Sequence, residues 1–253
     1  MANSAWLTRF PRPSSRCRLT LVCFPHAGAG AAVFHGLARL LPEAVETVAV
    51  VLPGREARLR EPPLVSMAAI VDGAAAAIAA QCYGQPLAFF GHSMGAIVAF
   101  EVAKRFHREG RPPPARLFLS GRRALNHPSG ESPLSMLDDA GFVAEMARRY
   151  GGIPAAVLED AELLRLFLPA MRADIRAIES YRLAPDHARL PVPFTLMGGT
   201  ADPQCSEAAW AGWRELSSVP VEMLRFPGGH FYFLDDRASI AQAIVARLAS
   251  LGC

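Results

Sequence analysis

Hydrophobic residues along the chain fall into short continuous runs that alternate with segments of helical periodicity. Each run has the length of a buried strand and is bounded by glycine, proline or polar residues. The pattern predicts strands at Arg18–Phe24, Thr47–Leu52, Pro86–Gly91, Ala115–Ser120, Pro193–Met197 and Val221–Phe226. It predicts helices at Ala31–Leu41, Met67–Gln81, Ala96–His107, Trp210–Leu216 and Ser239–Leu251. Continuous apolar strands separated by helices indicate an α/β fold, in which a mostly parallel sheet is covered by helices on both faces.

One region breaks this alternation. Between Gly121 and Leu190 no strand is expected, and two helical patterns, Leu137–Tyr150 and Ala155–Tyr181, fill the space. We therefore expect a single domain over residues 1–253, with a helical insertion at about 124–190. An all-helical insertion in an α/β chain predicts a lid over a binding site, and a packing subdomain is the alternative.

Composition narrows the class of protein. The chain has 253 residues, 51% of them hydrophobic, and a formal net charge of +3. A hydrophobic fraction this high excludes disorder, and a charge this small gives no reason to expect nucleic acid as a partner. No apolar stretch approaches the ~20 residues of a membrane span, and the N-terminus lacks the apolar core of a signal peptide. We therefore expect a cytoplasmic protein that is not bound to a membrane.

The cysteines indicate no metal site. There are five of them, an odd number, and neither metal-ligand spacing nor a C-x-x-C pair occurs among Cys17, Cys23, Cys82, Cys205 and Cys253. We expect reduced, structural cysteines and no bound metal.

The strongest chemical signal is the motif Gly91-His92-Ser93-Met94-Gly95, which follows a predicted strand and precedes a predicted helix. That context is what a nucleophile elbow requires, because the serine must lie on a tight, strained turn between strand and helix. The motif predicts Ser93 as a catalytic nucleophile.

A serine nucleophile needs a base and an acid that orients the base. His230 follows the Gly228-Gly229 pair after the last predicted strand, and Asp202 follows the strand before it. Their order along the chain, serine then acid then histidine, is that of hydrolases with this elbow. Two competing acids, Asp235 and Asp236, are better explained as first-turn and capping residues of the last helix.

Acyl transfer also needs two backbone N–H donors for an oxyanion. Met94, directly after the nucleophile, is one candidate, and Ala27 in the small-residue loop Pro25–Gly30 is the other. A nucleotide-binding turn is the alternative for this loop, but the third glycine and a phosphate-binding lysine are both missing. His26 and His92 flank the predicted site and are interpreted as packed, hydrogen-bonded loop residues.

With these residues assembled, the chain resembles the type II thioesterases of polyketide and nonribosomal peptide assembly lines, which have the α/β-hydrolase fold. The likeness covers nearly the whole chain. It is carried by Leu21–Gly28, Pro53–Arg55 with Arg58, Gly91–Gly95, Leu119–Arg122, Asp202–Pro203 and Gly228–Tyr232. One departure is Gly28-Ala29-Gly30, where the family has adjacent glycines; it bears on the shape of the loop and not on the triad.

The resemblance implies a serine thioesterase that removes aberrant or stalled acyl groups from the phosphopantetheine arm of an acyl or peptidyl carrier protein. Such an enzyme needs no cofactor of its own, and we expect it to act in trans, as a monomer. The same-class alternatives are a medium-chain fatty acyl carrier protein thioesterase and a general carboxylesterase. A non-catalytic interaction protein with this fold is a further alternative, which the complete set of serine, aspartate and histidine disfavours.

Carrier proteins are acidic, so arginines at the entrance of the site would help to dock one. The candidates are Arg122 and Arg123 at the start of the insertion and Arg148 and Arg149 within it. Plain solvated surface is an equally good interpretation of each pair.

Overall fold

A twisted seven-stranded sheet forms the centre of the protein, in the order β1-β3-β2-β4-β5-β6-β7. This computed structural model describes residues 5–10, 18–82, 84–126, 132–151, 160–184 and 189–249. Only β1 runs antiparallel to its neighbour; every other pair of adjacent strands is parallel. The expected α/β fold with a mostly parallel sheet is therefore confirmed.

The strands are β1 (Leu7–Phe10), β2 (Leu19–Phe24), β3 (Val45–Val50), β4 (Leu87–His92), β5 (Leu117–Ser120), β6 (Phe194–Gly199) and β7 (Val221–Phe226). The helices are α1 (His35–Ala38), α2 (Met67–Gln81), α3 (Met94–Arg108), α4 (Asp139–Tyr150), α6 (Ala161–Ser180), α7 (Glu207–Trp210), α8 (Tyr232–Asp235) and α9 (Arg237–Leu248).

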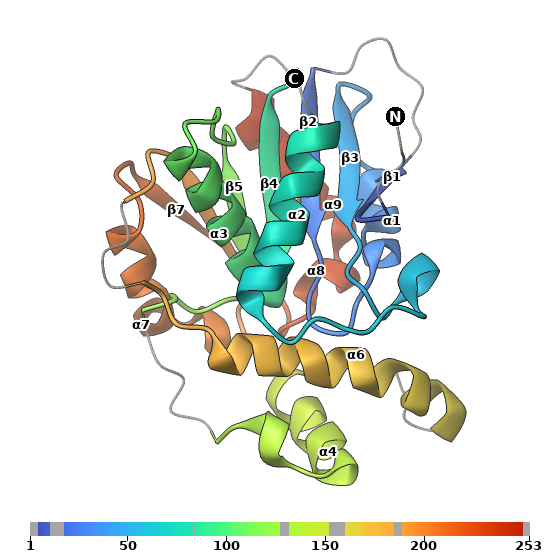
Figure 1. Ribbon diagram of the computed structural model, residues 1–253. Helices are drawn as coiled ribbons and strands as arrows, with labels where there is room; N and C mark the ends of the chain where they lie inside the picture. Colours follow the sequence, from blue (N-terminus) through green and yellow to red (C-terminus); the bar gives the residue numbers. More distant parts are fainter. Residues whose placement is uncertain are drawn as a thin grey trace.

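Helices cover both faces of the sheet (Figure 1). Helices α2 and α3 lie on one face, where their buried residues form one hydrophobic core with the strands. Helices α1, α8 and α9 lie on the other face and contribute to a second core. Every residue of β2 is buried, as is expected of a central strand with helices on both sides. Within the described part of the chain, no helix is both long and apolar enough to cross a membrane.

Two predicted helices are shorter and tighter than the sequence pattern suggested. Residues Ala31–Phe34 form a 3₁₀ turn before the four-residue α1, and Ala211–Glu215 form another after α7. The buried side chains in both segments are spaced by three, as in Trp210, Trp213 and Leu216. A spacing of three places side chains on one face of a 3₁₀ helix, so both segments pack without completing a long α-helix.

Strand β1 was not expected from the sequence. It has four residues, of which only Leu7 is buried, so its apolar pattern is too short to stand out. It pairs along the edge of the sheet with β3.

The insertion between β5 and β6 lies below the carboxyl ends of the strands (Figure 1), where Met171 of α6 contacts Gly28 in the loop after β2. Within it the structure describes a 3₁₀ turn at Leu134–Met136 and the helices α4 and α6. Helix α6 is described from Ala161, and the start of its predicted helical pattern, at residues 155–159, lies outside the described residues. So do Cys17, Cys253, His127 and His187. That the insertion acts as a lid, and that the chain forms a single domain, stay predictions.

Candidate active site

Ser93 lies on the sharp turn between β4 and α3. Its backbone angles are φ 55° and ψ −112°, in a region that non-glycine residues rarely occupy. A Cβ atom on Gly95 would lie 2.0 Å from the carbonyl oxygen of Phe24, so only glycine permits this approach between α3 and β2. The motif thus forms a strained strand-to-helix elbow, the type of position at which functional strain is found.

His230 and Asp202 form a buried pair. The imidazole Nδ1 lies 2.8 Å from Asp202 Oδ2, and both side chains are almost completely buried. Because a carboxylate can only accept, Nδ1 carries the proton, which leaves Nε2 as the free lone pair of the ring. The His230 ring lies 5.0 Å from that of His92, the residue directly before Ser93. The acid and the base are therefore paired beside the serine elbow.

Both carboxylate oxygens of Asp202 accept hydrogen bonds. Oδ1 accepts from the Gln204 backbone N–H at 2.9 Å, and Oδ2 accepts from the Cys205 thiol at 3.3 Å in addition to His230. Burial alone would raise the pKa of the Asp202 carboxyl, but its hydrogen bonds, led by that from His230, lower this pKa below its ordinary value. The carboxylate is therefore ionised at neutral pH and can stabilise a positive charge on the imidazole.

The two loops that carry this pair meet through their backbones. A Cβ atom on Gly199 would lie 2.2 Å from the Gly229 carbonyl oxygen, so the end of β6 and the loop after β7 touch directly. The N–H groups of Thr200 and Ala201 donate to the carbonyls of Phe226 and Gly228. These contacts place the acid loop against the base loop.

The two predicted oxyanion donors lie at the start of α3 and in the loop after β2. Met94 is the first residue of α3, where a backbone N–H has no partner within the helix. Ala27 lies in the loop after β2, and no hydrogen bond between described residues uses its N–H. The N-terminus of α3 adds partial positive charge at this point.

His26 and His92 are packed against aromatic rings and hydrogen-bonded, but His92 is the last residue of β4 and not a loop residue. The His26 Nδ1–H donates to the Ala27 carbonyl at 3.0 Å, and His92 Nδ1 lies 2.8 Å from Ser120 Oγ. Burial lowers the pKa of His26 to about 4 and that of His92 well below its ordinary value. Both rings are therefore neutral near pH 7 and hold the loops in place.

The four arginines predicted to dock a carrier have different surroundings. Arg149 is nearly buried and donates to Glu145 and to the Ser132 carbonyl, whereas Arg148 pairs with Glu145 at the surface. Their hydrogen bonds lower the pKa of Glu145 to about 2. Arg123 donates to Gln204 Oε1, and Arg122 and Arg123 are both partly buried. Of the four, Arg148 is the most accessible to solvent. That these arginines dock a carrier protein stays a prediction.

Sequence reasoning missed two features of the site. The ring of Tyr150, the last residue of α4, lies 5.1 Å from the His230 ring, so the insertion reaches the catalytic base. A buried carboxylate on α6, Asp174, accepts from the N–H of Gly28 beside the oxyanion loop. The one signal for Asp174 in the sequence is a charged residue on the face of the helix that the pattern predicts to be buried. Without a known partner, such a residue does not indicate a specific role.

Among the described residues, no group of three or more His, Cys, Asp or Glu side chains is suited to a metal ion.

The sequence is similar to those of known proteins. Residues 19–248 match the model of the family described as the thioesterase domain. The chain is 40% identical to the thioesterase PikA5 of Streptomyces venezuelae over 243 residues, which cover 96% of this chain and 85% of that protein. It is 33% identical to the gramicidin S biosynthesis protein GrsT of Aneurinibacillus migulanus, covering 93% of this chain and 91% of that one.

Solved structures show the same relationship. The type II thioesterase BorB from the borrelidin biosynthetic cluster superimposes with a TM-score of 0.84 at 33% identity. The superposition covers 96% of both chains.

Proposed function

We propose a function from the premise that the chain belongs to the thioesterase domain family. The protein is a type II thioesterase, which hydrolyses acyl groups from the carrier proteins of a polyketide or nonribosomal peptide synthase. Its relatives include a thioesterase and a protein named for gramicidin S biosynthesis, and its structural neighbours include a type II thioesterase. The observation that carries the proposal is the strained Ser93 elbow beside the buried Asp202–His230 pair.

In the first step, His230 Nε2 takes the proton of Ser93 as the hydroxyl oxygen attacks the thioester carbonyl carbon. Asp202 holds the imidazole in the required tautomer and stabilises the imidazolium that forms. The N–H groups of Ala27 and Met94 stabilise the negative oxygen of the tetrahedral intermediate. The intermediate collapses when the carbon–sulfur bond breaks, and His230 returns its proton to the leaving thiol of the phosphopantetheine arm.

In the second step, His230 takes a proton from water, and the resulting hydroxide attacks the acyl-serine ester. Collapse of the second intermediate breaks the bond to Ser93, which recovers its proton from His230. The products are a free carboxylic acid and the regenerated enzyme. Both steps use the same base and the same oxyanion donors, so one site serves the whole cycle.

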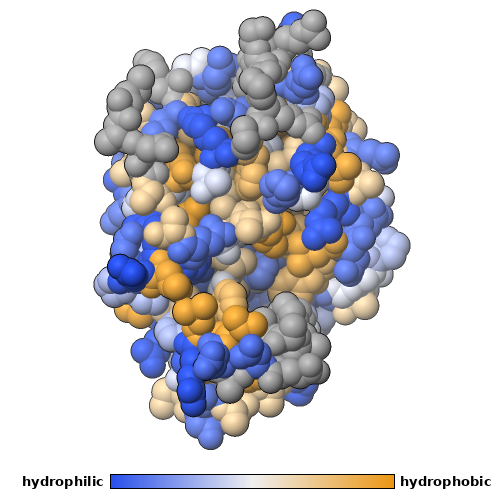
Figure 2. Space-filling view, turned by 90° about the vertical axis from the view of Figure 1, so that its right-hand side faces the viewer, coloured by the Kyte–Doolittle hydropathy of each residue, from blue (hydrophilic) through white to orange (hydrophobic). Residues whose placement is uncertain are grey.

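The start of α6 offers a surface for the substrate or its carrier. Leu163, Leu166 and Phe167 are exposed there, and Arg165 is exposed between them. Figure 2 shows hydrophobic side chains gathered on the lower part of the face that it presents, over the start of α6. Apolar side chains with an adjacent cation suit both an acyl chain and the acidic surface of a carrier. That the enzyme acts in the cytoplasm as a monomer stays a prediction.

The proposal is tested by comparing Ser93→Ala with the wild-type enzyme on three kinds of substrate: acyl groups loaded on a carrier protein, acyl-pantetheine thioesters and oxygen esters. We expect the highest kcat/KM on the loaded carrier, and a loss of at least about 10⁴-fold in Ser93→Ala. A fluorophosphonate should label the wild-type protein and not the variant.

Thioester hydrolysis at the wild-type rate by Ser93→Ala would overturn the mechanism. A preference for oxygen esters, or for medium-chain fatty acyl groups on a fatty acid synthase carrier, would favour one of the two same-class alternatives.

A further inference from the structure

A buried ion pair joins helix α6 of the insertion to the body of the protein. The guanidinium of Arg55 donates to both oxygens of Asp174, at 2.6 Å and 2.9 Å. The exposed fractions of the two side chains are 4% and 1%, so the pair is almost fully removed from water. Arg55 lies in the loop after β3, and Asp174 lies in the second half of α6.

This pair also fixes the loop that carries the oxyanion donor. Asp174 Oδ2 accepts from the Gly28 N–H at 2.8 Å, and Arg55 donates to the Ala29 carbonyl at 3.1 Å. Gly28 and Ala29 directly follow Ala27. The pair therefore restricts the backbone directly after Ala27.

Helix α6 contacts the same loop through apolar groups. Met171, one turn before Asp174, packs against Gly28, where an added Cβ would lie 3.1 Å from its methyl carbon. Ala27 itself packs against the small hydrophobic core of the insertion, which consists of Leu134, Phe142, Met146, Leu168 and Ile175. The loop is therefore clamped between the sheet and α6.

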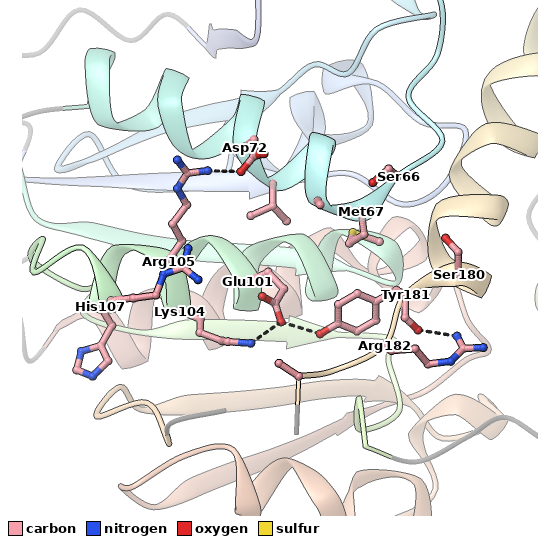
Figure 3. A pocket seen from close by; sticks show the side chains of 14 residues that line it. Ser66, Met67, Asp72, Glu101, Lys104, Arg105, His107, Ser180, Tyr181 and Arg182 are labelled. Carbon is pink, nitrogen blue, oxygen red and sulfur yellow. Dashed lines mark hydrogen bonds and ion pairs between the residues drawn. The ribbon is translucent and has the colours of Figure 1, made fainter. Parts of the chain in front are cut away.

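The far end of α6 is fastened to the body as well. Tyr181, directly after the helix, donates its hydroxyl to Glu101 of α3 at 2.7 Å, and Lys104 pairs with the same carboxylate (Figure 3). These side chains line a pocket of about 750 Å³ between α2, α3 and the end of α6. Among its charged side chains, Lys104 pairs with Glu101 and Arg105 pairs with Asp72. We therefore interpret the pocket as part of the interface between α6 and the body of the protein.

We propose that Asp174 is a positioning residue for thioester hydrolysis: it holds the oxyanion loop in its catalytic shape and, with Arg55, keeps α6 as a fixed wall of the site. This inference rests on the proposed function. A buried ion pair usually gives no net stability over apolar residues of the same volume. The pair instead acts by positioning, because the carboxylate of Asp174 orients both the Arg55 guanidinium and the Gly28 N–H.

The test uses variants that separate geometry from stability. In Arg55→Met/Asp174→Leu both charges are replaced by apolar side chains, which leaves no unpaired buried charge but removes the acceptor for the Gly28 N–H. The isosteric Asp174→Asn keeps an acceptor oxygen and loses the ion pair. Glu179→Gln is the matched control, because Glu179 lies on the same helix but accepts from the N–H groups of Leu134 and Ser135 and makes no hydrogen bond to the oxyanion loop.

We expect the double variant to fold and to lose about 10²-fold in kcat with KM changed less than about threefold, because a displaced donor acts on the transition state. Its inhibition constant for a boronic acid, which forms a tetrahedral adduct with a serine, should rise in the same proportion. Asp174→Asn should lose about tenfold, and Glu179→Gln should stay within about threefold of the wild-type rate.

Wild-type kcat and boronate affinity in the double variant would overturn the inference, as would an equal loss in Glu179→Gln. Should the double variant not fold, a wild-type rate in Asp174→Asn overturns it. All variants are measured on one thioester that the wild-type enzyme hydrolyses. Absence of wild-type turnover on every thioester would therefore count against the proposed function, whereas wild-type turnover with unaffected variants counts against this inference alone.

Discussion

The loops at the ends of the strands and the helices of the insertion both reach His230, but different forces hold them. The Ser93 elbow and the loops of Asp202 and His230 are held mainly by backbone contacts, whereas the oxyanion loop is held by side chains. The Ser93 N–H donates to the Ser120 carbonyl, and Gly95 lies so close to the Phe24 carbonyl that no side chain fits between them. Backbone positions of this kind do not depend on which side chains surround them, apart from the glycines.

The insertion is held by side chains. It has a small hydrophobic core of its own, and Ala177 of α6 belongs to one of the two cores of the sheet. Arg172 of α6 pairs with Asp139 and lies 4.5 Å above the ring of Phe142, and Glu179 binds the N–H groups that begin the turn at Leu134. Side-chain contacts change with single substitutions. The comparison indicates that the strand-end loops determine the chemistry, and that the insertion is the part in which the enzyme can be adapted to a substrate.

The largest effect is expected from the acid of the triad. Asp202→Asn should lower kcat by about 10⁴-fold, equivalent to about 5 kcal/mol of transition-state stabilisation, because the amide can hold His230 in the wrong tautomer. The thermal midpoint should change far less than the rate. Steady-state kinetics with an acyl-pantetheine and a thermal melt measure both quantities.

The matched control for this change is Asp235→Asn. Asp235 is an exposed carboxylate close to His230 in the sequence, and it lies in α8. We expect it to leave kcat within about twofold of the wild-type value. Equal losses in the two variants would show that charge near the loop, and not the Asp202–His230 hydrogen bond, supports catalysis.

The second effect compares one glycine from each region. Gly95→Ala would bring a methyl group against a backbone carbonyl, which cannot move without displacing β2, so we expect a loss of more than about 3 kcal/mol in the free energy of unfolding. Gly151, at the end of α4, has φ 66° and open space around it. Gly151→Ala should cost only about 1 kcal/mol, from the strained backbone alone. Urea unfolding of the two variants measures the difference, and similar costs would contradict the distinction between the two regions.

The same distinction explains how much the sequence could predict. The elbow around Ser93 and the loops of Asp202 and His230 each follow a strand with an apolar run, so local pattern and chain order were enough to place them at the carboxyl ends of parallel strands. Asp236 was predicted to cap the last helix, and its carboxylate accepts from the Ser239 N–H.

Features built from distant side chains could not be predicted in this way. Arg55 and Asp174 are 119 residues apart, and nothing in either local pattern indicates the other. The contact of Tyr150 with His230 depends on how α4 lies over the strand ends, and helical periodicity does not contain that information. The periodicity also suggested a full helix at Ala31–Leu41, where a spacing of three among buried residues produced a 3₁₀ turn instead.

The last effect that we predict concerns the free energy of unfolding at acidic pH, and it arises at the loop where the two regions meet. The pKa of His26 falls from 6.5 to about 4 on folding, because burial disfavours its charged form. Below pH 6.5 the unfolded chain therefore binds a proton that the folded protein refuses, and stability falls as the pH drops towards 4. The total loss from this residue is at most about 3 kcal/mol, and it is absent at pH 8.

His26→Asn should flatten the profile of unfolding free energy over this range, measured by urea titration at each pH. The rings nearest His26 belong to Phe231 in the loop after β7 and to His92 at the end of β4, so Glu179→Gln, which weakens contacts within the insertion, should keep the wild-type slope. A flattened profile in Glu179→Gln would mean that the insertion buries His26, and would contradict the separation between the two regions.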